Sequence, residues 1–236
     1  MCDSEGRNGI QLTFFGGPLT GAPRWSPDGR HIAFDSRPGG NPDIYIIDSE
    51  GGPPRRLTTE PSIDVVPSWS KDGRWIYFAS NRSGDFQVWK LPSEGGRAVQ
   101  VTKKGGSISQ ESNDGTYLYY AKNFYAPGLW GVRVEGGEEK PVIDDFPRES
   151  IYLWAATSQG IYFIGPVKQN TGPRPTLKYF MEFFSFATGH ITPFGPLEKE
   201  PKSEAPAFSL SSDGRWILYS QVDQSGSDIM LVENFR

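Results

Sequence analysis

The sequence predicts an all-β fold, a β-propeller of four-stranded antiparallel blades, and three observations support this prediction. The 28 glycines and 20 prolines make about one residue in five, which suits short strands joined by turns and interrupts long helices. Aromatic residues are 14% of the chain, and their large buried area offsets a hydrophobic fraction of only 36%. The third observation is an internal repeat with a spacing of 42 to 54 residues, which indicates propeller blades.

The repeat is centred on a Ser-x-Asp-Gly turn. It occurs as Ser26–Arg30, Ser70–Arg74 and Ser112–Thr116, in a degraded form as Thr157–Gly160, and again as Ser211–Arg215. The turn glycines stand at positions 29, 73, 115, 160 and 214, so the steps between them are 44, 42, 45 and 54 residues. Because glycine supplies the positive φ that closes a tight hairpin, we expect the same hairpin in every unit.

Each unit is expected to contain four strands in the same order. A short strand precedes the turn, an apolar strand follows it, and a polar loop leads to a third strand. A second hairpin, often Glu-Gly-Gly, then leads to an outer strand that ends near Thr58, Thr102 or Thr192. The second strands are rich in aromatic and β-branched residues, which is typical of strands covered on both faces. They are residues 31–34, 75–78, 117–120, 161–164 and 216–219.

Five units predict a single domain of five blades over residues 1–236. Residues 10–14 match an outer strand, and the chain ends on a third strand, so the N-terminal strand is expected to complete the last blade. A closed ring leaves no unpaired strand edge and predicts a monomer. The alternative is that the chain is the C-terminal part of a longer protein. The predicted blades are residues 20–58, 63–102, 106–143, 150–192, and 204–235 with 10–14.

Charge and cysteine content exclude several classes of protein. The formal net charge is −4 without a basic patch, which argues against nucleic-acid binding by this domain. The single cysteine, Cys2, excludes an intrachain disulfide and a cysteine-based zinc site. We find no signal peptide and no membrane segment in the chain. The compartment stays open: periplasmic if an export or membrane segment precedes Met1, and cytoplasmic otherwise.

Motifs for catalysis or metal binding are missing from the sequence. No Gly-x-Ser-x-Gly elbow occurs, and the two histidines, His31 and His190, lie far apart in the repeat, each typical of a structural or surface residue. Residues 223–228 place oxygen ligands at alternate positions, but the downstream Glu of a calcium loop is missing, so a hairpin loop is favoured. We therefore expect no catalytic residue, no bound metal and no cofactor. The alternative is a hydrolase or lyase that processes glycan or peptide.

The candidate ligand site is the mouth of the central channel, because propellers bind ligands where the innermost strands and their loops meet. The residues assigned to this mouth are Arg24, Asp64, Glu111 and Glu204. Their acidic balance would favour a cationic or polyhydroxylated ligand or a basic peptide. The alternative is an ordinary solvated loop surface.

The repeats resemble those of the TolB-like, WD40-like propeller family, also called PD40. Trp25–Arg30 followed by Asp43–Tyr45 fits the family pattern, as does Trp69–Arg74 followed by Ser80–Gly84, whereas Glu111 stands where the pattern has tryptophan. The end of the chain also resembles propellers fused to bacterial winged-helix transcriptional regulators. These resemblances imply a non-catalytic interaction or sensor domain that binds a protein or small ligand, within a signal-transducing regulator or a TolB-like periplasmic scaffold.

Overall fold

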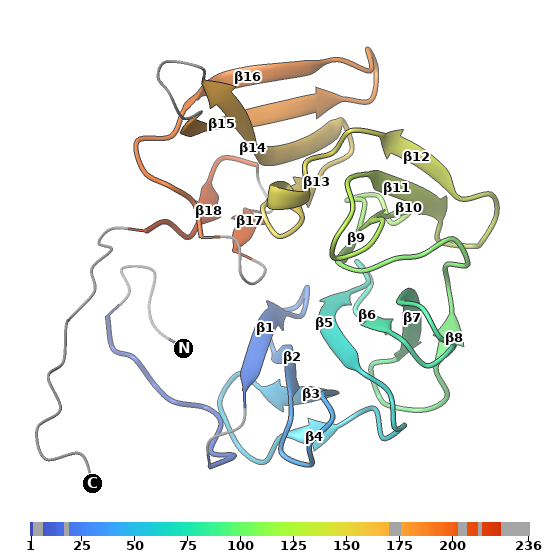
Figure 1. The fold of residues 1–236 in the computed structure, drawn as a ribbon. Coiled ribbons are helices and arrows are strands. Elements are labelled where there is room, and N and C mark those ends of the chain that lie inside the picture. The colour runs from blue at the N-terminus through green and yellow to red at the C-terminus, as the bar shows by residue number, and fades with distance from the viewer. Residues whose placement is uncertain (2–6, 17–18, 170–175, 203–206, 212–213, 223–236) are drawn as a thin grey trace, which may run out of the picture.

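The computed structural model of the protein places antiparallel sheets side by side around a central axis (Figure 1). Four sheets contain four strands each, and in every one the strands follow chain order from the first to the fourth. The predicted all-β propeller architecture is therefore confirmed. The structure describes residues 1, 7–16, 19–169, 176–202, 207–211 and 214–222.

Blades A to E follow one another along the chain. Blade A contains β1 (Thr20–Trp25), β2 (His31–Ser36), β3 (Asp43–Asp48) and β4 (Arg55–Arg56). Blade B contains β5 (Asp64–Trp69), β6 (Trp75–Ser80), β7 (Gln87–Pro92) and β8 (Val99–Gln100). Blade C contains β9 (Ser109–Glu111), β10 (Tyr117–Ala121), β11 (Leu129–Arg133) and β12 (Lys140–Ile143). Blade D contains β13 (Trp154–Ala156), β14 (Gly160–Gln169), β15 (Thr176–Ser185) and β16 (Ile191–Pro196), and β17 (Phe208–Leu210) with β18 (Ile217–Tyr219) form the described part of blade E.

Hydrogen bonds within the Ser-x-Asp-Gly turn explain its sequence. In the first turn the hydroxyl of Ser26 donates to Asp28 Oδ1 over 2.6 Å and accepts the N–H of His31 over 2.9 Å. The same carboxylate oxygen accepts the N–H of Arg30, and Gly29 has a φ of 70°. The second and third turns repeat all of these bonds. Serine, aspartate and glycine are therefore each required by the local geometry.

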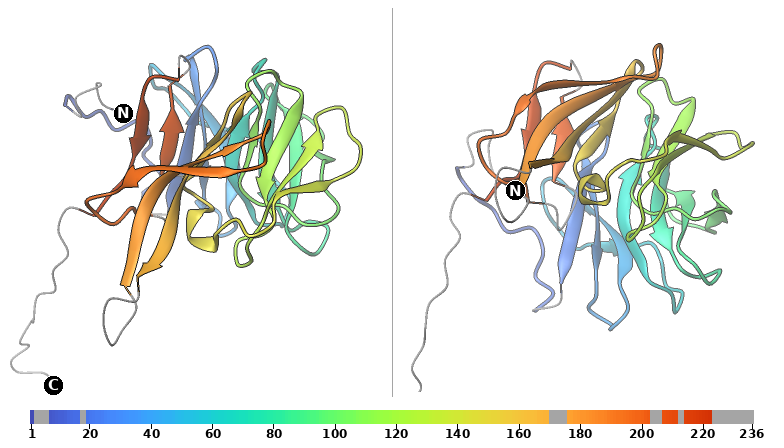
Figure 2. Two further views of the ribbon diagram at one scale, coloured as in Figure 1. Left: turned by 90° about the horizontal axis from the view of Figure 1, so that it is seen from above. Right: turned by 45° about the horizontal axis from the view of Figure 1, so that its top comes forward.

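Blade D departs from this pattern. Its turn is shorter, since the N–H of Thr157 donates to the carbonyl of Gly160 over 2.9 Å, and Gly160 is the first residue of β14. The prediction of a positive φ at Gly160 is wrong, because this glycine does not adopt one. A Cβ there would meet the carbonyl of Phe184 on the neighbouring strand, so glycine permits close approach of the backbones. The ten-residue strands β14 and β15 project from the ring (Figure 2).

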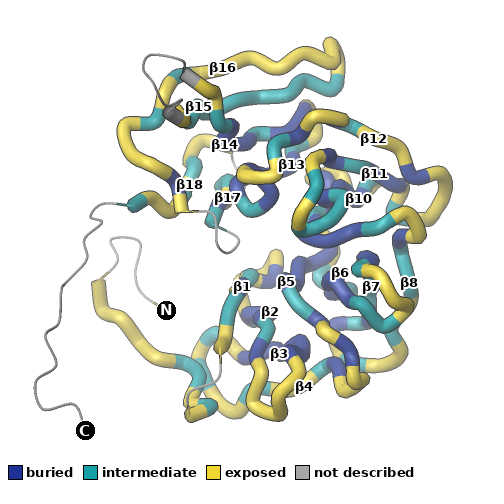
Figure 3. Tube along the Cα trace, viewed as in Figure 1, coloured by how far each residue is buried: buried dark blue, intermediate teal, exposed yellow. Residues whose placement is uncertain are grey.

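The core consists of side chains packed between neighbouring blades. Blade A contributes Ile44 and Ile46 to a cluster with Ile76 and Phe78 of blade B, while Tyr77 faces blade C in a second cluster. The middle strands are accordingly buried and the outer strands exposed (Figure 3). The predicted covering of the second strands on both faces holds for residues 76–79, which are all fully buried.

The N-terminal segment does not form the outer strand that the sequence predicts. Residues 10–14 are not in a strand, and the N–H of Ile10 donates to the carbonyl of Met1 instead. Leu12 and Phe15 pack on blade A, where the Phe15 ring centroid lies 5.3 Å from that of Tyr45. Blade A therefore covers Leu12 of the predicted strand, whereas Ile10 and Phe14 are exposed.

Blade E has two hydrogen-bonded strands in the part of the chain that the structure describes. The third strand predicted near the C-terminus lies outside the described residues, as does the calcium-like string 223–228. The number of blades and the closure of the ring stay predictions. Among the described residues no helix has the length and apolar character to span a bilayer, and Arg148–Ser150 forms a single helical turn.

Candidate functional site

A pocket of about 500 Å³ opens where the innermost strands end at the Ser-x-Asp-Gly turns. We call this pocket the turn mouth. The innermost strands of blades A to E line it, and hydrogen bonds join neighbouring strands: Trp69 Nε1 donates to the carbonyl of Arg24 over 2.9 Å, and Gln110 Nε2 donates to that of Trp154 over 2.9 Å. One lining residue from each blade in turn is Arg24, Ser68, Gln110, Ala155 and Ser209.

Arg24 is the principal charged group of the turn mouth. It lies near the end of β1 and is half-buried. Its guanidinium makes no hydrogen bond or ion pair with any residue that the structure describes. Burial lowers the pKa of Arg24 from 12.5 to about 10, so the group remains a cation at neutral pH. A desolvated cation without a counter-ion is unfavourable and has the capacity to bind an anion.

Glu111 also lines the turn mouth, but its carboxylate is fully engaged by the protein. The residue is only 6% exposed. Its Oε1 accepts a 2.5 Å hydrogen bond from the Tyr77 hydroxyl, and its Oε2 accepts a 2.7 Å bond from the N–H of Lys71. Burial, followed by this bond to Glu111, raises the pKa of Tyr77 well above its usual range. Glu111 therefore has a structural role in holding blade B against blade C.

Lys71 is a mouth residue that the sequence analysis missed. It occupies the variable position of the second Ser-x-Asp-Gly turn and lines the turn mouth, where burial lowers its pKa and the charge of Glu111 opposes that effect. Among the described residues its ammonium has no hydrogen-bond acceptor or ion-pair partner. The signal was available, because Pro27 and Asn113 hold the same position in other blades and also line the pocket.

Asp64 does not belong to the turn mouth. It is the first residue of β5, whereas Ser68 and Trp69 at the other end of the strand line the pocket, so Asp64 lies roughly 16 Å away. Its side chain is completely buried and forms a 2.7 Å ion pair with Arg82. The repeat assigned Asp64 to a loop before an innermost strand but could not show that blade B supplies a partner cation.

The other sequence-based candidates do not gather at the turn mouth. Glu204 lies outside the described residues. His31 begins β2 and lines a groove between blades A and B, and His190 is exposed in the turn before β16. Within the described ranges no three His, Cys, Asp or Glu side chains are arranged to hold a metal ion. Among the described residues, the charges that line the mouth without a partner, Arg24 and Lys71, are positive. Because Glu204 is not among these residues, the acidic mouth expected from the sequence stays a prediction.

Residues 8–133, more than half of the chain, match the family described as PD40, the TolB beta propeller domain. The chain belongs to this family. The Tol-Pal system protein TolB of Syntrophus aciditrophicus (strain SB) is 44% identical to this PD40 chain over 38 residues, which are 16% of the chain and 8% of that relative.

Two solved structures share the fold of this PD40 propeller. TolB from Acinetobacter baumannii superposes with a TM-score of 0.71 at 18% identity, covering 94% of this chain and 53% of that one. Oligogalacturonate lyase from Vibrio parahaemolyticus superposes with a TM-score of 0.59 at 13% identity, covering 96% of this chain and 78% of that one. The chain thus spans about half the length of the TolB structure, and at these identities the likeness concerns the fold alone.

Proposed function

We propose that this PD40 propeller is a non-catalytic binding domain whose turn mouth receives an acidic segment of a partner protein. The observation that carries the proposal is the half-buried guanidinium of Arg24, which lacks a partner among the described residues. A carboxylate that enters the mouth would form a charge-assisted, bidentate hydrogen bond with it. The free energy gained would offset the unfavourable burial of an unpaired cation.

The surroundings of Arg24 favour an acidic peptide. Lys71 adds a second cation that has no partner in the described part of the chain, while the carboxylate of Glu111 is occupied by Tyr77 and the backbone of Lys71. Trp25, which is 51% exposed, lies beside Arg24 at the rim of the turn mouth. Tryptophan and arginine side chains contribute most to the binding energy of many protein interfaces. The mouth therefore offers an apolar anchor next to an anion site.

Anisotropy titration with two fluorescent peptides, hexaglutamate and hexalysine, tests whether the turn mouth binds a negatively or a positively charged ligand. We expect hexaglutamate to bind more tightly than hexalysine, and Arg24→Gln to weaken hexaglutamate binding about tenfold. Arg97→Gln is the matched control, since it removes the same charge from an exposed position that does not line the mouth. A preference for hexalysine, or equal effects of the two substitutions, would contradict the proposal.

The second candidate function is an enzyme, a hydrolase or lyase that processes glycan or peptide. The observation that favours it is the fold shared with oligogalacturonate lyase. Incubation of the chain with oligogalacturonates, followed by absorbance of the unsaturated product, tests the lyase directly. Turnover that exceeds that of heat-inactivated protein would replace the binding function with a catalytic one.

We also propose that the domain senses or binds a partner on behalf of a larger system. The resemblance of residues 211–236 to propellers of winged-helix regulators supports a role in transcriptional regulation. Membership of the TolB propeller family supports a periplasmic scaffold instead. The genomic sequence upstream of Met1 distinguishes the two, because a winged helix or an export signal encoded there in frame would decide between them.

A further inference from the structure

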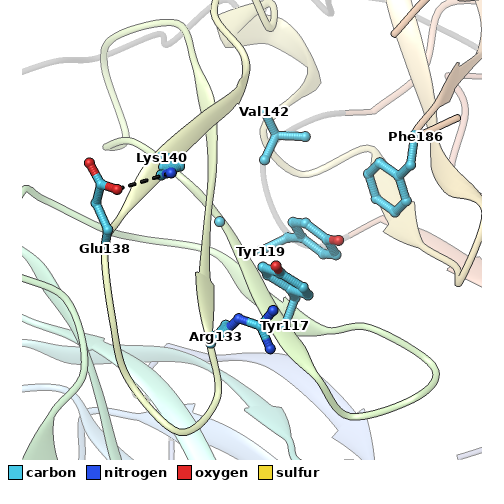
Figure 4. A pocket seen from close by; sticks show the side chains of 8 residues that line it. Tyr117, Tyr119, Arg133, Glu138, Lys140, Val142 and Phe186 are labelled. Carbon is cyan, nitrogen blue, oxygen red and sulfur yellow. Dashed lines mark ion pairs between the residues drawn. The ribbon is translucent and has the colours of Figure 1, made fainter. Parts of the chain in front are cut away.

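A second cavity, distinct from the turn mouth, lies between blades C and D. Its volume is about 380 Å³, and we call it the interblade cleft. Blade C supplies the floor and one wall, and Phe186, which follows β15, supplies the opposite wall from blade D. Figure 4 shows the ring of Phe186 across from that of Tyr119, with Arg133 beside Tyr117 and the ion pair of Glu138 and Lys140 on the far side.

The repeat explains why a cleft exists at this position. In blade B, Tyr77 faces Lys90 on the neighbouring strand, and the ammonium of Lys90 lies 4.8 Å from the ring centroid of Trp75 and 5.9 Å from that of Tyr77. In blade C the residue that faces Tyr119 is Gly131, so the neighbouring strand places no side chain opposite the Tyr119 ring. A Cβ on Gly131 would stand 3.2 Å from the ring of Tyr119.

Blade D leaves the outer part of the cleft open. Its outermost strand, β16, is exposed along nearly its whole length, whereas Leu57 and Val101 near the outer strands of blades A and B pack against the core. The walls that remain are aromatic: the ring centroids of Tyr117 and Tyr119 are 6.0 Å apart, and those of Tyr119 and Phe186 are 5.1 Å apart. Rings at these distances are in contact with one another, so a planar ligand packs against the face of the cluster that lines the cleft and not between two of its members.

The charged side chains on the rim favour a ligand with a negative charge. Lys140 forms a 3.0 Å ion pair with Glu138, and both side chains are largely exposed, so this pair is weak. The Arg133 guanidinium lies 5.3 Å from the ring centroid of Tyr117 and makes no ion pair with any described carboxylate. Aromatic rings attract cations, but Arg133 already occupies this position over Tyr117 and leaves its N–H donors available.

We propose that the interblade cleft binds an aromatic carboxylate, with the ring packed against the cluster of Tyr117, Tyr119 and Phe186 and the carboxylate on Arg133. The shared chemistry is a planar ring next to an acid group, which both a free aromatic acid and the C-terminal aromatic residue of a peptide provide. The ring is desolvated against Tyr119 and Phe186, and the acid receives charge-assisted hydrogen bonds from the guanidinium. This site is independent of the turn mouth and goes beyond the function proposed for it.

Protein-observed NMR on the full chain tests the cleft, with the backbone amide resonance of Gly131 as the reporter. The probes are phenylpropionate and acetyl-glycyl-phenylalanine, each compared with its amide. We expect the acids to bind with a Kd of about 1 mM and the amides about tenfold more weakly. The two acids distinguish a small-molecule site from a peptide site, since the extra peptide unit improves affinity only in the second case.

Two substitutions separate the contributions of charge and ring. Arg133→Gln, at an exposed position, should abolish the preference for acid over amide while amide binding persists. Phe186→Leu should weaken acid and amide equally and leave their ratio unchanged. Arg24→Gln is the control for the turn mouth and should change the affinity for neither the acid nor the amide. The proposal for the cleft can therefore fail independently of the function proposed for the turn mouth. Thermal unfolding establishes that each variant is folded.

Three results would overturn the proposal. The first is equal affinity of wild type for acid and amide. The second is retention of the acid preference in Arg133→Gln. The third is a larger resonance change at Ser68 or Gln110 of the turn mouth than at Gly131, which would place the aromatic acid in the other pocket.

Discussion

The pKa of each turn aspartate depends mainly on the serine two residues before it. Asp28, Asp72 and Asp114 each accept a hydrogen bond from the serine that opens the turn. This bond is the main cause of a lowered pKa for all three carboxyls, to about 2 in Asp72 and Asp114. Such local bonds were predictable in kind, because the spacing of serine and aspartate fixes them within one turn.

A pH-dependent stability follows for the turns. Because the pKa of Asp72 is lowered in the folded state, its stabilising effect is complete above about pH 4 and is lost as the pH falls toward about 2. We expect Asp72→Asn to be less stable than wild type at pH 7 and the difference to shrink toward pH 2. Urea unfolding at several pH values measures it, with Asp85→Asn, at an exposed position outside the turns, as the control. A constant difference across this range would disprove the assignment.

Long-range partners at the residue scale were not predictable. Arg24 and Asp64 both belong to innermost strands, yet Arg24 lines the turn mouth without a partner among the described residues and Asp64 is buried against Arg82. Glu111 replaces a tryptophan of the repeat and was assigned to ligand binding, but it accepts the hydroxyl of Tyr77 from another blade. A repeat period places a residue along its strand and carries no information about which side chain of the neighbouring blade meets it.

At the scale of the strand, blades A and B each have a threonine whose hydroxyl joins the end of the outer strand to the third strand. Thr102 Oγ1 accepts the N–H of Val88 over 2.8 Å and donates to Gln87 Oε1 over 3.1 Å. Thr58 makes the equivalent bonds to Ile44 and Asp43. The sequence repeat located both threonines at the ends of outer strands, and the structure supplies the reason, since each satisfies the backbone where the strand pairing stops.

The isosteric substitution Thr102→Val tests the contribution of this hydroxyl to stability. It leaves the buried N–H of Val88 without its acceptor, so we expect a loss of about 1–3 kcal/mol in the free energy of unfolding. Denaturant titration measures the loss. Thr192→Val is the matched control, because Thr192 lies in the corresponding strand of blade D but is exposed, and a change below about 0.5 kcal/mol is expected there. Comparable losses in the two variants would argue against the hydrogen bond as the cause.

At the scale of the whole molecule, the regular repeat made the propeller predictable, but the ends of the chain were not. The apolar residues in the segment 10–14 indicate only that one side needs a cover, and any apolar face meets that need. Blade A covers Leu12 and, through Phe34 and Tyr45, Phe15, whereas Ile10 and Phe14 stay exposed. The interblade cleft could likewise not be predicted from the sequence, because it results from one glycine in blade C together with the departure of blade D from the repeat pattern.

Two adjacent phenylalanines test how the N-terminal segment contributes to the molecule. Phe15 is half-buried on blade A, whereas Phe14 is 78% exposed. We expect Phe15→Ala to lower the free energy of unfolding by about 1–2 kcal/mol and Phe14→Ala to leave it nearly unchanged. Thermal or urea unfolding compares them. If Phe14→Ala proved the more destabilising, the segment would pack differently in solution, as ring closure through residues 10–14 requires.

The self-contained hydrogen bonding of the Ser-x-Asp-Gly turn has a consequence for how such a propeller diversifies. The serine, aspartate and glycine form the hydrogen bonds of the turn, and the side chain between serine and aspartate takes part in none of them. Pro27, Lys71 and Asn113 occupy this position, and all three border the same opening. Blades A, B and C thus each place one variable side chain at a shared rim. A new ligand specificity can evolve, or be engineered, by substituting these variable residues one at a time while the propeller fold is retained.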